Sequence, residues 1–187
     1  KGSWSSFNDN NFFEIAYSLN RQFGQHGIYR NIPLYNFLDN HDVNRIASTL
    51  KCSEHLPLVY GLLFTMPGIA SVYYGSEFGI HGKKENGNDK PLRPALEKLY
   101  FSELTQWIAK LIQIRKQSPA LYNGDYKELL VASKQFAFMR SFQNENIAVV
   151  FNCDFNNATL NLKLQQNGWD LLTESTINLS NVIMQPN

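Results

Sequence analysis

Two short apolar runs that lie between helical patterns constrain the fold of this chain more than any other feature. Apolar residues recur at helical spacing over residues 8–27, 53–66 and 99–117, which predicts three helices. The apolar, β-branched and aromatic runs at 32–39 and 68–75 predict short buried strands between them. Because helix and strand alternate, this part of the chain is typical of parallel βα units.

The pattern changes after residue 118. Short strand-like runs follow one another at near-regular spacing, separated by clusters of Asn, Gly and Asp. We therefore predict an α/β part over residues 1–118 and a small antiparallel β-sandwich domain over residues 119–187. Its aromatic side chains are spaced for burial on alternating strands: Phe136, Phe138, Phe142, Phe151 and Trp169. One more closing strand would be expected beyond "VIMQPN", so the sandwich is predicted to be incomplete at its edge.

Two parallel strands cannot form a barrel or a doubly wound sheet by themselves, because their edges stay unpaired. Either further strands precede this chain in a longer protein, or a second copy of the chain covers the edges. The chain starts at Lys1 and enters a helical pattern almost directly, which favours a piece of a longer protein. Self-association through exposed strand edges is the alternative.

Charge and cysteine usage exclude several classes of partner. A net charge of +1 gives no reason to expect nucleic acid or an anionic membrane, and no apolar run approaches the ~18 residues that a membrane span requires. Cys52 and Cys153 match no metal or redox spacing, and the histidines complete no metal site. We expect reduced thiols, no metal and no cofactor, with a cytoplasmic compartment as the default; calcium binding by a longer parent stays open.

Polar side chains follow each predicted strand at its carboxyl end. Asn40, His41 and Asp42 follow the first strand, and Tyr74 and Glu77 follow the second. The carboxyl ends of parallel strands meet at one rim, where α/β barrels carry their active sites. A structural alternative is that Asp and Asn cap the next helix and that the imidazole is only a satisfied polar group.

The order of several motifs is more specific than any single residue. "FLDNHD", a helix, "MPGIASVYYGSE" and a loop closing in "NDKPLRPAL" precede "LIQIRKQSPAL", "NGDY" and "AFMRSF". This order resembles the last third of the α-amylase superfamily of retaining α-glycosidases, especially its maltodextrin-acting, cyclomaltodextrinase-like members. The resemblance implies that residues 1–118 hold strands 7 and 8 of a (β/α)8 barrel and that residues 119–187 form the C-terminal β-sandwich. "GIAS" departs from the Gly-x-Pro usual in the family.

The resemblance also implies roles for the polar residues. Asp42 matches the family's third catalytic carboxylate, whose charge stabilises a sugar ring that becomes positive in the transition state. His41 matches a hydrogen-bond donor to a substrate hydroxyl, and Asn40 is expected to orient its neighbours in the same substrate site. Arg93 and Asp89 are expected at the substrate rim, although a plain loop role fits them equally well. The implied partner is an α-glucan or maltooligosaccharide.

Four neighbouring residues are expected to support this site without acting on substrate. Tyr73, Tyr74 and Glu77 are predicted to be structural. Arg45 is predicted to pair with a carboxylate at the start of a helix.

The family's nucleophile and acid/base carboxylates belong to motifs of barrel strands 4 and 5, and no "G-x-R-x-D" run occurs in these 187 residues. We therefore expect the isolated chain to be inactive and a longer parent to cleave α-glucosidic bonds. Two alternatives stay open. One is a non-catalytic barrel relative that acts as a carbohydrate-binding or partner subunit, and the other is an independent carbohydrate-binding module formed by residues 119–187.

Overall fold

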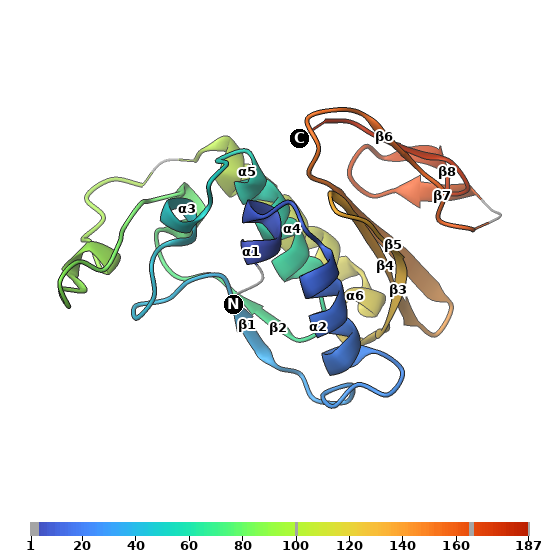
Figure 1. Cartoon of the computed structure of the whole chain (residues 1–187), viewed down its shortest axis with the longest axis horizontal. Helices are drawn as coiled ribbons and strands as arrows, with labels where there is room; N and C mark the ends of the chain where they lie inside the picture. The colour runs from blue at the N-terminus through green and yellow to red at the C-terminus, as the bar shows by residue number, and fades with distance from the viewer. Residues whose placement is uncertain (1–3, 100, 165–166, 187) are drawn as a thin grey trace.

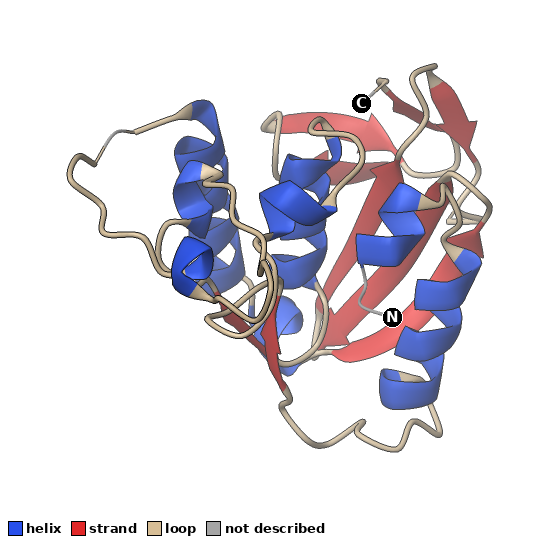
Figure 2. Ribbon diagram, turned by 60° about the vertical axis from the view of Figure 1, so that its left-hand side comes forward, coloured by secondary structure: helices blue, strands red, loops and turns tan. Residues whose placement is uncertain are grey.

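The computed structural model describes residues 4–99, 101–164 and 167–186. Its helices are α1 (Trp4–Asn8), α2 (Phe13–Phe23), α3 (Ile46–Thr49), α4 (His55–Thr65), α5 (Glu103–Gln117) and α6 (Pro119–Asn123), with 3-10 turns η1 (Ser76–Phe78) and η2 (Lys90–Leu92). Its strands are β1 (Tyr35–Phe37), β2 (Ile69–Ser71), β3 (Asp125–Val131), β4 (Gln135–Phe142), β5 (Glu145–Asn152), β6 (Ala158–Leu160), β7 (Asn167–Asp170), β8 (Ser175–Asn178) and β9 (Val182–Met184). Figures 1 and 2 show the helices between the short β1–β2 pair and the β3–β5 sheet.

The two strands predicted in the first part of the chain pair with each other in parallel. Tyr35 lies opposite Ile69, and Phe37 lies opposite Ser71. The prediction of parallel pairing is therefore confirmed, but the prediction that both faces are buried is wrong. Tyr35 is 65 % exposed, because α4 covers only one face of this two-stranded sheet in the described part of the chain.

Helices α4 and α5 pack against each other and against the parallel pair. Tyr60, Leu63 and Phe64 of α4 meet Ile108 and Leu111 of α5 in one buried cluster. The helix predicted at 99–117 begins only at residue 103, because Ser102 caps it by accepting a hydrogen bond from the N–H of Thr105.

The helix predicted over residues 8–27 is α2, Phe13–Phe23, which is shorter at both ends. Asn8 is instead the last residue of the separate helix α1. Its side chain accepts a hydrogen bond from the N–H of Lys51 at 2.7 Å and donates one to the carbonyl of Thr49 at 2.9 Å. The amphipathic part of the pattern, from Phe13 to Phe23, is helical as predicted.

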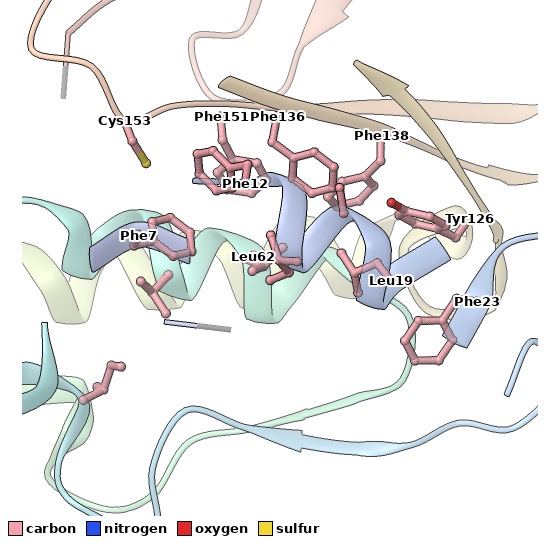
Figure 3. Close-up of a cluster of buried hydrophobic side chains, with 14 residues drawn as sticks. Phe7, Phe12, Leu19, Phe23, Leu62, Tyr126, Phe136, Phe138, Phe151 and Cys153 are labelled. Carbon is pink, nitrogen blue, oxygen red and sulfur yellow. The ribbon is translucent and has the colours of Figure 1, made fainter. Parts of the chain in front are cut away.

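The largest core lies between α2 and the sheet β3–β4–β5. The ring of Phe12 lies 5.8 Å from that of Phe136 and 6.4 Å from that of Phe151, and Figure 3 shows these rings facing the helices. Phe138 and Tyr126 extend the cluster toward the end of α2. This core joins residues on both sides of residue 118, and the division into two domains at that point stays a prediction.

The second part of the chain is antiparallel, as its sequence predicts. Strands β3–β4–β5 form one sheet, while β6 pairs with β9 and β7 pairs with β8. Of the run predicted at 158–165, residues 158–160 are a strand and 161–164 are not, while residue 165 lies outside the described residues. The run at 169–175 is the end of β7, a turn and the start of β8. The additional closing strand stays a prediction.

The predicted burial of the aromatic residues is right for Phe136, Phe138 and Phe151 and wrong for Trp169. Trp169 is 62 % exposed, and Phe142 is half-buried. In the β7–β8 hairpin, Trp169 pairs with Thr176, which is also exposed. The opposite face, which includes Ile177, packs on the small core beneath.

Among the helices of the described ranges, none is long and apolar enough to cross a bilayer.

Candidate functional site

The turn that follows β1 presents the predicted polar residues. The side-chain oxygen of Asn40 accepts hydrogen bonds from the N–H groups of Asp42 at 2.8 Å and Val43 at 3.2 Å, an Asx turn that Asn favours. The side chains of His41 and Asp42 are 55 and 64 % exposed on this turn. Asn40 thus holds the backbone of the turn, and its contact with a substrate stays a prediction.

Four of the predicted site residues come together in space, and we call them the rim cluster: His41, Asp42, Asp89 and Arg93. His41 Nε2 lies 3.2 Å from Asp42 Oδ2, while Arg93 Nη2 lies 3.6 Å from Asp42 Oδ1 and 2.8 Å from Asp89 Oδ2. Arg93 Nη2 also donates to the carbonyl of His41 at 3.3 Å, across a sequence separation of 52 residues.

A tight turn supplies the second half of the rim cluster. The N–H of Leu92 donates to the carbonyl of Asp89 at 2.9 Å within η2, which places Asp89 and Arg93 on the same side. Leu92 itself is fully buried and anchors the turn. In Figure 1 this loop and the turn after β1 project on the same side of the molecule, away from β6–β9.

Asp39 lies behind the rim cluster and has a different role from Asp42. It is buried, and its Oδ2 accepts a 2.7 Å hydrogen bond from the N–H of Ile46 at the start of α3. Its Oδ1 accepts another from Ser76 Oγ at 2.7 Å. The structural alternative, a carboxylate that caps the next helix, is therefore right for Asp39.

Arg45 is fully buried, at 0 % exposure. It was predicted to pair with a carboxylate, but it does not do so directly. Its Nη1 donates to the carbonyl of Tyr74 at 2.7 Å and to Ser76 Oγ at 3.0 Å, and its Nη2 donates to the carbonyl of Leu92 at 2.7 Å. The same Ser76 hydroxyl donates to Asp39, so the carboxylate balances the guanidinium through one hydroxyl group.

The backbone at Gly75 makes this arrangement possible. Its φ of +85° lies in the left-handed region, and an added Cβ would collide with the side chain of Ile80. The chain can therefore turn sharply after β2 and bring the hydroxyl of Ser76 back between Asp39 and Arg45.

The two tyrosines after β2 pack on the guanidinium of Arg45. Its Cζ lies 4.2 Å from the ring centre of Tyr73 and 5.2 Å from that of Tyr74, within the range of cation–π attraction. The ring of Tyr73 also lies 6.3 Å from the imidazole of His41. These contacts are consistent with the structural role predicted for both tyrosines.

Tyr60 and Ser76 also support this arrangement, although no sequence pattern marks either residue as part of the site. The hydroxyl of Tyr60 donates to the carbonyl of Ser76 at 2.9 Å. Burial first, and then the charges of Asp39 and Glu77, raise the pKa of Tyr60 far above its ordinary value. Tyr60 is hidden in the sequence because it lies in the apolar stretch of α4. Glu77 lies apart from the rim cluster, and its Oε2 is buried without a hydrogen-bond partner in the described structure.

The rim cluster offers hydrogen-bond acceptors on two carboxylates and donors on a guanidinium and an imidazole. Half-exposed groups of both kinds suit a ligand with many hydroxyl groups. Among the residues that the structure describes, no group of three or more His, Cys, Asp or Glu side chains could hold a metal ion. The prediction that no cofactor is needed stays a prediction.

Parallel strands whose carboxyl ends carry charged residues on loops define the class: an α/β protein with its site at the carboxyl rim of the sheet. A model of the α-amylase catalytic domain matches residues 10–100 of the chain. Over these residues, just under half of its length, the chain is similar to the α-amylase family.

Curated relatives carry the same family names. The chain is 32 % identical over 131 residues to a beta/alpha-amylase of Paenibacillus polymyxa, a match that covers 66 % of the chain and 11 % of that protein. It is 28 % identical over 162 residues to a cyclomaltodextrinase of Thermoanaerobacter pseudethanolicus, covering 84 % of the chain and 28 % of that protein. The chain therefore spans only a minor part of the length of the relatives it matches.

Solved structures show the same fold. An Anoxybacillus α-amylase superimposes with a TM-score of 0.77 at 24 % identity, covering 97 % of this chain and 42 % of that one. A maltogenic α-amylase from Thermotoga neapolitana gives 0.78 at 19 % identity, covering 97 % of this chain and 46 % of that one. The mixed α/β arrangement followed by antiparallel sheets is thus that of α-amylase-family enzymes.

Proposed function

We propose that this chain is the part of an α-glucan-acting glycoside hydrolase that supplies one wall of the substrate site. In this proposal β1 and β2 are strands 7 and 8 of the catalytic barrel, and the loops after them face the scissile bond. The observation that supports it is the rim cluster: residues of two distant motifs meet at the carboxyl ends of a parallel strand pair.

Asp42 is the central residue of the proposed mechanism. Its two oxygens face different partners, His41 on one side and Arg93 on the other. A carboxylate offers about four lone-pair sites, so both oxygens still have acceptor capacity for sugar hydroxyls. The carboxylate charge then lies beside a ring that becomes positive in the transition state, an interaction that is stronger there than in the ground state.

His41, Arg93 and Asp89 bind the sugar in this proposal. His41 donates from its imidazole to a hydroxyl of the same residue that Asp42 contacts. Arg93 and Asp89, paired at 2.8 Å, form the outer rim beside it. The nucleophile and the acid/base that double displacement requires belong to the upstream part of the parent, so the isolated chain is inactive.

The test compares this chain with one extended upstream through the whole barrel. p-Nitrophenol release from a p-nitrophenyl α-maltooligoside is expected only from the long form. Asp42→Asn should lower kcat/KM of that form by roughly 10²–10³-fold or more. Asp125→Asn is the matched control, because Asp125 is also an exposed carboxylate paired with an arginine, Arg30, on a different part of the surface. It should leave kcat/KM unchanged.

Other outcomes decide between the alternatives. A folded but inactive long form that still binds maltooligosaccharide would favour a non-catalytic, carbohydrate-binding relative. Activity in the 187-residue chain itself would show that the essential carboxylates are not missing. Binding that persists in residues 119–187 alone would favour the independent binding module.

A further inference from the structure

The contacts that Arg93 makes in the rim cluster are exposed. Its side chain is 45 % exposed, and its distances are 3.6 Å to Asp42 and 2.8 Å to Asp89. Exposed ion pairs contribute little, because water screens them and two long side chains must be ordered. The backbone that carries Arg93 therefore matters for its orientation toward Asp42.

The backbone on both sides of Arg93 is tied down, and both ties involve Arg45. The carbonyl of Leu92 accepts a 2.7 Å hydrogen bond from Arg45 Nη2. The carbonyl of Pro94 accepts one of 3.1 Å from the hydroxyl of Tyr74. The carbonyl of Tyr74, in turn, accepts a 2.7 Å hydrogen bond from Arg45 Nη1.

We propose that Arg45 is a positioning residue for the rim cluster: it fixes the backbone of residues 92–94 and thereby sets Arg93 against Asp42 and His41. The consequence for catalysis rests on the proposed function, whereas the positioning itself does not.

The chemistry of arginine suits this role. One planar guanidinium reaches the carbonyls of two separate segments at once, which the single ammonium of lysine cannot reproduce with the same geometry. The side chain is fully buried under Tyr73 and is balanced by Asp39 through the Ser76 hydroxyl. Buried and partnered on several sides, Arg45 is a far stiffer support than the exposed pairs of the rim.

The first experiment needs only the 187-residue chain. NMR signals of the His41 ring and of the Arg93 guanidinium are recorded for wild type, Arg45→Lys, Arg93→Gln and the double variant. Arg45→Lys and Arg93→Gln should shift the His41 signals in the same direction, and the double variant should match Arg93→Gln alone. Arg140→Lys is the control, since Arg140 is an equally buried arginine that holds carbonyls elsewhere. It should leave the His41 signals unchanged.

The proposal would be overturned if Arg45→Lys folds and its His41 and Arg93 signals are those of wild type. It would also be overturned if the shifts in the double variant equal the sum of the shifts in the two single variants. If Arg45→Lys does not fold, Tyr74→Phe replaces it, because this change removes the tie to Pro94 and leaves Arg45 in place. A smaller shift in the same direction is then expected, and no shift would overturn the proposal.

The second experiment uses the upstream-extended chain. Arg45→Lys should lower kcat/KM roughly 10- to 100-fold, because a small displacement of a substrate-positioning group is costly, and Arg93→Gln in the Arg45→Lys background should add little. Arg140→Lys should leave kcat/KM unchanged below its melting temperature. An inactive wild-type long form would sink the proposed function, while the NMR result would still decide the role of Arg45.

Discussion

Two fully buried arginines, Arg45 and Arg140, lie in different halves of the molecule and have similar structural roles. Arg45 is 0 % and Arg140 is 1 % exposed, and each donates three hydrogen bonds from its terminal nitrogens, mostly to backbone carbonyls. In both, Nε has no partner in the described structure. Each side chain holds together segments that are distant in sequence.

Their surroundings differ. Arg45 has a carboxylate one hydroxyl group away and two aromatic rings beside it. Arg140 has a second cation nearby instead, Arg115. Burial first, and then the charge of Arg115, lower the pKa of Arg140 to about 9, with partial compensation from Asp125.

The segments they hold differ as well. Arg140 binds the carbonyls of Thr65, Leu121 and Gly124, so it joins the ends of α4 and α6 to β4. Arg45 binds a loop that ends in exposed charges. A buried arginine therefore contributes only to stability at Arg140, whereas Arg45 also positions a candidate site.

Replacing Arg140 by Met should have the largest effect on stability. Methionine fills much of the volume but removes the donor from three carbonyls, one buried and two part-buried, and each buried group left unsatisfied costs about 1–3 kcal/mol. We expect a loss of about 3–5 kcal/mol in the free energy of unfolding, measured by urea denaturation. Arg21→Met, at an exposed position on α2, is the control and should change little. A loss below about 1 kcal/mol for Arg140→Met would mean that the three bonds contribute nothing net.

Ser76→Ala tests the charge compensation that distinguishes Arg45. The change removes the hydroxyl that links Asp39 to Arg45 and leaves a buried carboxylate oxygen unsatisfied. A loss of about 1–3 kcal/mol is expected. Ser141→Ala, which removes a solvent-facing hydrogen bond to Asn146, should cost less than about 0.5 kcal/mol. Equal losses in the two variants would contradict a special role for the linkage.

Much of this architecture could be predicted, because it is encoded locally. Periodicity placed α2, α4 and α5, and the apolar runs placed β1 and β2. The meeting of Arg93 with Asp42 is not local, and only the order of motifs shared with a family indicated it. Asn40 was expected to orient its neighbours, and its Asx turn with Asp42 is a contact between nearest neighbours.

The errors concern partners that lie far away in sequence. Arg45 was expected beside a carboxylate, yet its direct acceptors are two carbonyls and a serine hydroxyl, which no sequence pattern reveals. Alternation along a strand does not tell which face is covered, so the exposure of Trp169 was missed.

Arg93→Gln should have a much smaller effect on stability than Arg140→Met or Ser76→Ala. Its ion pairs are half-exposed, so the free energy of unfolding should fall by less than about 1 kcal/mol. The difference from wild type should shrink further in 1 M salt, which screens such pairs. Thermal melts at low and high salt measure both effects. A loss as large as that of Arg140→Met would erase the distinction between an exposed rim and its buried support.

Thiol reactivity should report local opening of the core beside β5, in variants that change stability least. Cys153 is buried in the core beside β5, and burial, with a smaller contribution from Cys52, raises its pKa to about 12. At pH 8 only roughly one thiol in ten thousand is then ionised, against about one in four in an unfolded chain.

Folded Cys52→Ser protein, which keeps only Cys153, should therefore resist a disulfide reagent until it unfolds. Cys153→Ser protein should react faster through Cys52, which is only half-buried. Because folded Cys153 keeps its proton at a pH where the unfolded thiol has lost it, its contribution to stability is complete below pH 9 and falls as the pH rises toward 12. Fast labelling of Cys153 in native protein would show that the core at the end of β5 opens more readily than its burial predicts.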